Sequence, residues 1–296
     1  MEWIEAKSLL SKNKCPEEWF GFDYNLNLYK GCCHGCIYCD SRSQCYRIDR
    51  FDVVRGKKDA ALILEKELRH KKSRGIIGMG AMSDPYNPFE KEVHLTREAL
   101  MLIERYGFGA GITTKSDLIL EDLELLKRIH ENMTTVVNFT ITSASDECSL
   151  KIEPHVAVSS KRFEAVRRCK EAGLICGIIM NPVLPFITDS KENILKIIEM
   201  AHLCHADYIM TYMGVTLRQN QRDHYYKKLE ELYPGLSYQY QRIYGNRYHC
   251  ESLKWRENYE LLKEECLKRG ILYQMEDIVK LIRSHKKEVR QLSLFG

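Results

Sequence analysis

Residues 29–45, YKGCCHGCIYCDSRSQC, contain five of the twelve cysteines in this chain of 296 residues. Such crowding is typical of a disulfide framework, a zinc site or an iron–sulfur cluster. The N-terminal residues do not form a basic start followed by an apolar run, and no uncharged apolar stretch reaches bilayer length. We therefore expect a cytoplasmic protein without a membrane partner. Thiols stay reduced in that compartment, which favours metal or redox chemistry over disulfides.

The spacing of these cysteines narrows the kind of site. Cys32, Cys36 and Cys39 form the pattern C-x3-C-x2-C. A structural zinc site needs four ligands, usually from two separate pairs. A fourth ligand is available from Cys33, His34 or Cys45. Zinc therefore remains an alternative, whereas three thiolates on an iron–sulfur cluster would leave one iron open for chemistry.

Short apolar runs alternate with runs of helical periodicity along most of the chain. The apolar runs occupy residues 24–30, 75–82, 108–115, 134–143, 174–185 and 207–216. The helical runs occupy residues 58–72, 94–107, 120–131, 160–173 and 190–204, with Gly107 and Gly173 where C-caps belong. This order predicts a parallel sheet with right-handed crossovers. Six units fall short of the eight of a closed barrel, so we expect an α/β fold with a partial (β/α)6 TIM-like barrel.

In a parallel β/α fold, ligands bind at the carboxyl ends of the strands. The cysteine stretch follows the first strand, and Ser83 and Asp84 follow the second. Lys115 follows the third strand and Thr140 ends the fourth. Because these ends meet at one edge of the sheet, we expect the polar side chains to converge there.

The cysteine pattern, with Tyr38 before its last cysteine, resembles the radical S-adenosylmethionine (SAM) superfamily over residues 20–215. The resemblance implies that three residues ligate a 4Fe-4S cluster: Cys32, Cys36 and Cys39. It also implies that SAM binds the open iron and is cleaved reductively to methionine and a 5′-deoxyadenosyl radical. The radical would then abstract a hydrogen atom from a substrate.

Three segments are similar to the spore photoproduct lyase group in particular: residues 31–42 (GCCHGCIYCDSR), 83–92 (SDPYNPFEKE) and 113–126 (TTKSDLILEDLELL). By that similarity, Ser83 and Asp84 hold the SAM amino group and Lys115 pairs with its carboxylate. Thr140 would contact the ribose or carboxylate region, and Tyr38 would lie near the adenine.

One departure concerns the hydrogen-atom donor. Spore photoproduct lyases carry a catalytic cysteine where this chain has Ala81. The catalytic residue is therefore unknown, and the candidate donors are Tyr86, Tyr212, Cys148 and Cys176. The last of these is more consistent with packing inside the fifth strand.

The end of the chain carries a second motif, QLSLF. Its residues are Gln291, Leu292, Ser293, Leu294 and Phe295. They resemble the short peptide by which bacterial DNA repair and replication proteins bind the sliding clamp, with apolar residues entering a groove. The alternative is that these residues pack on the protein's own domain.

Together these features predict a radical SAM enzyme acting on DNA or another nucleic acid, in repair or modification. We expect an N-terminal segment (1–20), a radical SAM core (21–216), a C-terminal extension (217–284) and a clamp-binding tail (285–296). The Tyr- and Arg-rich segment 238–248 is the expected nucleic-acid contact surface. Expected partners are DNA, the clamp, and a reductant such as flavodoxin or ferredoxin. The alternatives are a protein, peptide or metabolite substrate, or a non-enzymatic zinc-binding clamp adaptor.

Overall fold

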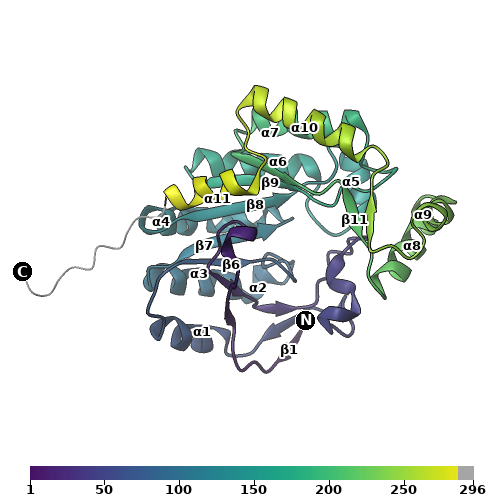
Figure 1. The fold of residues 1–296 in the computed structure, drawn as a ribbon. Helices are drawn as coiled ribbons and strands as arrows, with labels where there is room; N and C mark the ends of the chain where they lie inside the picture. The colour runs from purple at the N-terminus through teal and green to yellow at the C-terminus, as the bar shows by residue number, and fades with distance from the viewer. Residues whose placement is uncertain (286–296) are drawn as a thin grey trace, which may run out of the picture.

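The computed structural model describes residues 1–285, and a seven-stranded sheet forms its centre (Figure 1). The strand order is β10-β9-β8-β7-β6-β3-β2. Its strands are β2 (Leu10–Lys12), β3 (Tyr24–Leu26), β6 (Ile76–Met79), β7 (Gly109–Thr114), β8 (Thr135–Thr140), β9 (Ile175–Met180) and β10 (Tyr208–Thr211). Only β2, at the edge, pairs antiparallel. The six parallel strands confirm the expected partial barrel.

The crossover helices also lie where the sequence predicts them. They are α1 (Ala60–Arg69), α3 (Leu95–Arg105), α4 (Leu123–Asn132), α6 (Ser159–Glu171) and α7 (Lys191–Leu203). Gly107 and Gly173 follow two of these helices with φ of 68° and 82°, as helix C-caps require. Every residue of β8 and β9 is buried, because helices cover one face and side chains of the barrel interior the other.

Short elements that the sequence did not predict hold the cysteine stretch. A second sheet has the order β1-β5-β4, from β1 (Glu2–Ile4), β5 (Arg55–Lys57) and β4 (Tyr29–Lys30). Gly31 follows β4 with φ of 80°, and a Cβ there would lie 2.4 Å from the carbonyl oxygen of Val53. Only glycine fits this close approach. The remaining short helices are η1 (Pro16–Glu18), η2 (Asp40–Arg42), η3 (Gln44–Tyr46), α2 (Glu90–Val93), η4 (Asp117–Asp122) and α5 (Asp146–Ile152).

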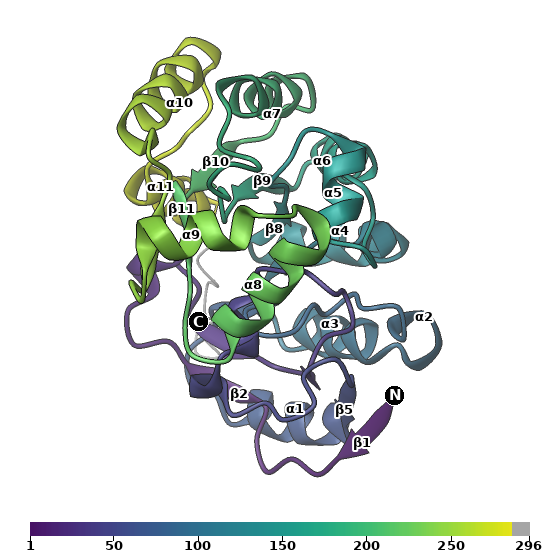
Figure 2. The ribbon, with the colours of Figure 1, turned by 90° about the vertical axis from the view of Figure 1, so that its right-hand side faces the viewer.

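The C-terminal part adds a two-stranded ribbon and four helices. These elements are β11 (Gly214–Thr216), α8 (Gln221–Leu232), α9 (Leu236–Tyr244), β12 (His249–Glu251), α10 (Trp255–Arg269) and α11 (Met275–Ser284). α10 runs beside α7, while α8 and α9 project next to β11, as Figures 1 and 2 show. Leu262 of α10 joins the main core and Ile278 of α11 packs with Phe20, so these helices are firmly attached to the sheet.

The structure corrects the expectation that segment 238–248 as a whole forms a nucleic-acid contact surface. Tyr240 and Tyr244, one helical turn apart on α9, are 0% and 4% exposed, and they belong to a packed aromatic cluster. These two residues are therefore part of the core and not of a contact surface. Tyr238 and Tyr248 of the same segment remain exposed.

Two further findings bear on partners. Among residues 1–285, no helix combines the length and the apolar character needed to cross a membrane. The clamp-like motif at residues 291–295 lies outside the described residues, so its role stays a prediction.

Candidate active site

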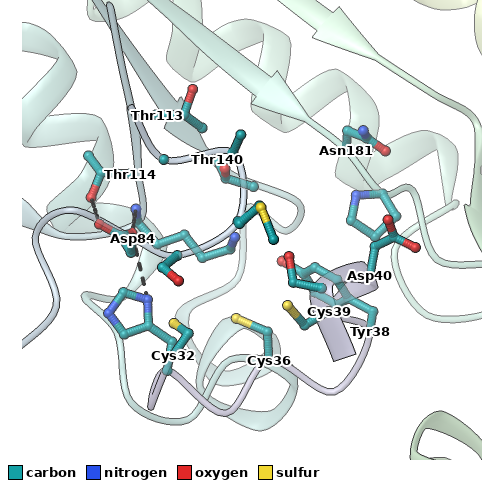
Figure 3. A pocket seen from close by; sticks show the side chains of 18 of the residues that line it. Cys32, Cys36, Tyr38, Cys39, Asp40, Asp84, Thr113, Thr114, Thr140 and Asn181 are labelled. Atoms are coloured by element: carbon teal, nitrogen blue, oxygen red, sulfur yellow. Dashed lines mark hydrogen bonds and ion pairs between the residues drawn. The ribbon is translucent and has the colours of Figure 1, made fainter. Parts of the chain in front are cut away.

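A cavity of about 300 Å³ opens at the carboxyl ends of the parallel strands (Figure 3). The cysteine loop closes one side, and the ends of β6, β7 and β8 form the other. The predicted site residues that line it are Cys32, Cys36, Cys39, Tyr38, Ser83, Asp84, Lys115, Thr140 and Tyr212. The structure therefore brings together the cluster and cofactor residues that the sequence singled out.

Backbone contacts fix the shape of the cysteine loop. The amide of Cys32 donates to the carbonyl of Phe51 over 2.9 Å, and the amide of Ile37 donates to the carbonyl of Ile152 over 3.0 Å. These bonds tie the loop to two separate segments of the chain. The three cysteine side chains point into the same cavity from this loop (Figure 3).

The thiols are suited to a cluster. Burial raises the pKa of Cys32 to about 12 and also raises the pKa of Cys36 and Cys39. Buried thiols lose their protons when a bound metal centre compensates the charge. Within residues 1–285, no three His, Cys, Asp or Glu side chains converge closely enough to hold a single metal ion. Three thiols on one loop can each bind a different iron of a cluster.

Ser83 offers an unmet hydrogen-bonding group in the cavity wall. Its Oγ is buried and has no hydrogen-bond partner. Buried polar atoms are nearly always paired, so an orphaned hydroxyl beside a cavity points to a polar ligand. An amino or carboxylate group such as those of SAM would satisfy it.

The Asp84 carboxylate organises the strand ends around the cavity. It accepts hydrogen bonds from Thr114 Oγ1 at 2.7 Å, the Tyr86 amide at 2.9 Å and the Lys115 amide at 2.8 Å. His34 Nδ1 lies 3.6 Å from it, and burial lowers the pKa of His34. Asp84 thus joins β6, β7 and the cysteine loop, a role that its sequence position alone did not reveal.

Lys115 places a cation inside the cavity wall. Its Nζ lies 5.7 Å from the centroid of the Tyr38 ring. Burial acts to lower the pKa of Lys115, but Cys36 and Glu153 outweigh it and hold the pKa above its usual value. The Lys115 ammonium group therefore stays protonated, and its positive charge matches an anionic group such as a carboxylate.

Beneath Tyr38 lies an ion pair that the sequence analysis missed. Tyr38 donates a hydrogen bond to Glu153, whose Oε2 is 2.6 Å from Arg162 Nη2. Both charged side chains are almost fully enclosed. Arg162 also donates to the carbonyl of Thr140 over 2.8 Å, so the pair connects the cysteine loop with the end of β8.

The four candidate hydrogen-atom donors differ in whether they line the main cavity. Tyr86 is buried, donates to Asp122 over 3.0 Å and lines a different cavity of about 400 Å³. Cys148 is half-buried against the aromatic cluster that contains Tyr240 and Tyr244, outside the main cavity. Cys176 is fully buried within β9, as expected for a packing residue. Of the four candidates, only Tyr212 lines the cavity.

Comparisons with known proteins agree with this geometry. A family model described as the radical SAM superfamily matches residues 26–201. An uncharacterised protein of Methanocaldococcus jannaschii is 30% identical over 190 residues, which cover 63% of this chain and 68% of that protein. An uncharacterised protein of Mycobacterium tuberculosis is 28% identical over 249 residues, which cover 81% of this chain and 72% of that protein.

Among solved structures, a variant of spore photoproduct lyase with bound SAM and a dinucleoside spore photoproduct superposes with a TM-score of 0.66. It is 15% identical and covers 92% of this chain and 81% of its own. Identity this low shows likeness of fold alone. The family match spans more than half of the chain and includes the three cysteines. The chain therefore belongs to the radical SAM superfamily, whose cofactors are a 4Fe-4S cluster and S-adenosylmethionine.

Proposed function

We propose that this radical SAM enzyme acts on nucleic acid, with DNA as its substrate and repair or modification as the outcome. The observation that carries the proposal is Arg218, which reaches the lining residue Asp40 and contacts the segments 45–46 and 248. Together with three arginines on or bonded to these segments it forms what we call the arginine rim: Arg47, Arg218, Arg222 and Arg247. Spore photoproduct lyase, which shares the fold, binds a dinucleoside photoproduct, and this supports the same class of substrate.

Arg218 joins the rim to the cavity. Its Nε lies 3.4 Å from Asp40, a lining residue, and its Nη2 donates to Tyr248 over 2.7 Å. Arg222 donates to the main-chain oxygens of residues 246 and 247. Arg47 and Arg247 are exposed and form no ion pair with a carboxylate in the described chain. Unpaired arginines near exposed tyrosine rings suit phosphates and bases.

The cavity residues divide into separate roles. The thiols of Cys32, Cys36 and Cys39 hold the cluster. Ser83 and Lys115 orient SAM through its amino and carboxylate groups, while Asp84 positions the strand ends. SAM bound to a reduced cluster supplies a 5′-deoxyadenosyl radical. A base inside a duplex is out of reach of such a cavity, so the target nucleotide has to be extruded.

Two protein partners belong to the proposal. The cluster needs an electron from a reductant such as flavodoxin or ferredoxin. The terminal motif at residues 291–295 would hold the enzyme on the sliding clamp, which would place it on DNA. The clamp interaction rests on the sequence motif alone.

The test is DNA-dependent SAM cleavage. The anaerobically reconstituted enzyme receives dithionite and SAM, and 5′-deoxyadenosine is measured with ultraviolet-irradiated duplex, with intact duplex and without DNA. We expect irradiated or otherwise modified DNA to raise the yield. If DNA has no effect while a peptide or metabolite pool raises the yield, the substrate belongs to another class.

Charge reversal on the rim supplies the matched variants. Arg47→Glu and Arg247→Glu should weaken DNA binding and reduce the slope of log K against log salt by about 0.9 for each lost phosphate contact. Arg167→Glu, in an exposed ion pair on α6, is the control. Equal DNA affinity of rim and control variants would remove the rim from the proposal.

A further inference from the structure

The cavity wall contains few groups that can give a hydrogen atom to a carbon radical. Phenol O–H and thiol S–H bonds are weak enough, whereas the hydroxyls of serine and threonine hold hydrogen too strongly. The three cysteines of the wall serve the cluster, and Ala81 has no such bond. Tyr38 has its hydroxyl bonded to the buried Glu153. Among the described lining residues, this leaves Tyr212.

Tyr212 is held firmly at the cavity edge. It follows β10, and its carbonyl accepts hydrogen bonds from the amides of Val183 at 3.2 Å and Gly214 at 2.8 Å. Its hydroxyl oxygen lies 2.9 Å from Nδ1 of His249 on β12. The two rings meet edge to face, with centroids 5.9 Å apart. Burial and the carboxylate of Glu251 raise the pKa of Tyr212 to about 12, so the phenol keeps its hydrogen at neutral pH.

We propose that Tyr212 is the hydrogen-atom donor that quenches carbon radicals in this cavity. The inference rests on the proposed function, in which a substrate radical forms there. The Tyr212 O–H bond breaks, a C–H bond forms on the radical carbon, and the unpaired electron moves to the phenoxyl oxygen. One electron from the reductant that serves the cluster and one proton from solvent then restore the phenol.

His249 is the positioning residue for this step. When its Nδ1–H donates to the phenol oxygen, the phenol O–H is not engaged in that bond and can be given to a radical. Tyr248 packs against the His249 ring with centroids 4.4 Å apart, and Arg218 holds the Tyr248 hydroxyl. Arg218 of the arginine rim therefore also supports, through Tyr248, the histidine that positions the donor.

The experiment follows deuterium into 5′-deoxyadenosine. The reconstituted enzyme is incubated with SAM and dithionite in D2O without nucleic acid. The tyrosine hydroxyl exchanges with solvent, whereas the C–H bonds of the protein do not. Mass spectrometry should show mostly deuterated product for the unmodified enzyme. In Tyr212→Phe the ratio of deuterated to undeuterated product should fall about tenfold, equivalent to about 1.4 kcal/mol in the competing barriers.

Controls and a second readout keep the test decisive. Tyr259→Phe, on a half-buried tyrosine of α10 outside the cavity, should leave the deuterium content unchanged. Rapid freezing should trap a phenoxyl radical signal that is absent from Tyr212→Phe. Unchanged deuterium content in Tyr212→Phe would overturn the inference. Because nucleic acid is omitted, a failure of DNA to stimulate SAM cleavage would count against the proposed function and leave this result standing.

Discussion

Arg162 Nη2 lies 2.6 Å from Glu153 Oε2, and the two side chains are 0% and 1% exposed. Burial acts to raise the pKa of Glu153, but Arg162 and Lys115 outweigh it and hold the pKa below its usual value. The carboxylate therefore stays charged. It supports Tyr38 in the cavity wall and is itself held by a side chain from α6.

Removing one member of this pair should lower the free energy of unfolding. Arg162→Met leaves Glu153 charged and unpaired, which costs about 3–5 kcal/mol for buried pairs. Arg167→Met breaks an exposed ion pair on the same helix and should cost less than about 1 kcal/mol. Urea unfolding of both variants checks the difference. Equal stability of the two would mean that the buried pair contributes no more than an exposed one.

Alanine variants of the three proposed cluster cysteines should differ from variants of the other cysteines in their iron and sulfide content. Cys36→Ala should lose iron and acid-labile sulfide after anaerobic reconstitution, because a buried ligand is missing. Cys45→Ala, outside the cavity, should retain both. About one zinc per chain and no sulfide in the unmodified protein would argue instead for the zinc-binding adaptor.

Lys115→Ala should weaken SAM binding and leave cluster assembly intact. A hydrogen bond to a charged group contributes about 1.5–3 kcal/mol, so the dissociation constant should rise roughly 10- to 100-fold. Calorimetry with SAM on the reconstituted protein measures it. Lys127→Ala, on α4, is the matched control. Loss of the cluster itself in Lys115→Ala would assign the lysine to structure.

His224 should make stability depend on pH. Its Nε2 is buried without a partner, and burial together with Arg42 lowers its pKa to about 4. In the unfolded chain the pKa is about 6.5. Between these values the unfolded state binds more protons, so stability falls as the pH drops from about 6.5 to 4.

His224→Gln should remove that part of the pH dependence. At about 1.4 kcal/mol per pKa unit, the difference between variant and unmodified protein should reach at most roughly 3 kcal/mol by pH 4. Thermal unfolding across the pH range measures it. His202→Gln, on an exposed histidine of α7, should follow the unmodified protein. Parallel pH curves for His224→Gln and the unmodified protein would contradict the assignment.

Deleting residues 291–296 should abolish binding to the sliding clamp and leave SAM cleavage unchanged. Surface plasmon resonance with immobilised clamp measures the first, and 5′-deoxyadenosine yield the second. A variant with Leu292, Leu294 and Phe295 changed to alanine retains the length of the tail. Clamp affinity that survives both changes would mean that the motif is not a docking peptide.

The strands and the grouping of the three cysteines at one cavity could be predicted because their signals are local. A run such as residues 134–143 is rich in β-branched residues, and β8 lies within it. The thiols of Cys32, Cys36 and Cys39 share one loop. Ser83 and Lys115 follow from topology, because parallel strand ends meet at one edge.

The parts that could not be predicted depend on distant pairings. Glu153 has no motif around it, and its role arises only when α6 brings Arg162 beneath Tyr38. β1 and β5 are three-residue strands that pair across about fifty residues of chain. The buried face of α9 was predictable in principle, since Tyr240 and Tyr244 are spaced four apart, as helix core residues are.

The cavity wall draws on sequence from outside the family match. Residues 26–201 carry the cysteines and the strand ends with Ser83 and Lys115, whereas Tyr212, Val215 and Thr216 come after that region. Under the proposed function, the residues that generate the radical and the residues that meet the substrate therefore lie on separate stretches of chain. Substitutions in the β11–β12 ribbon should change which substrate reacts, whereas substitutions in the cysteine loop should abolish SAM cleavage with every substrate.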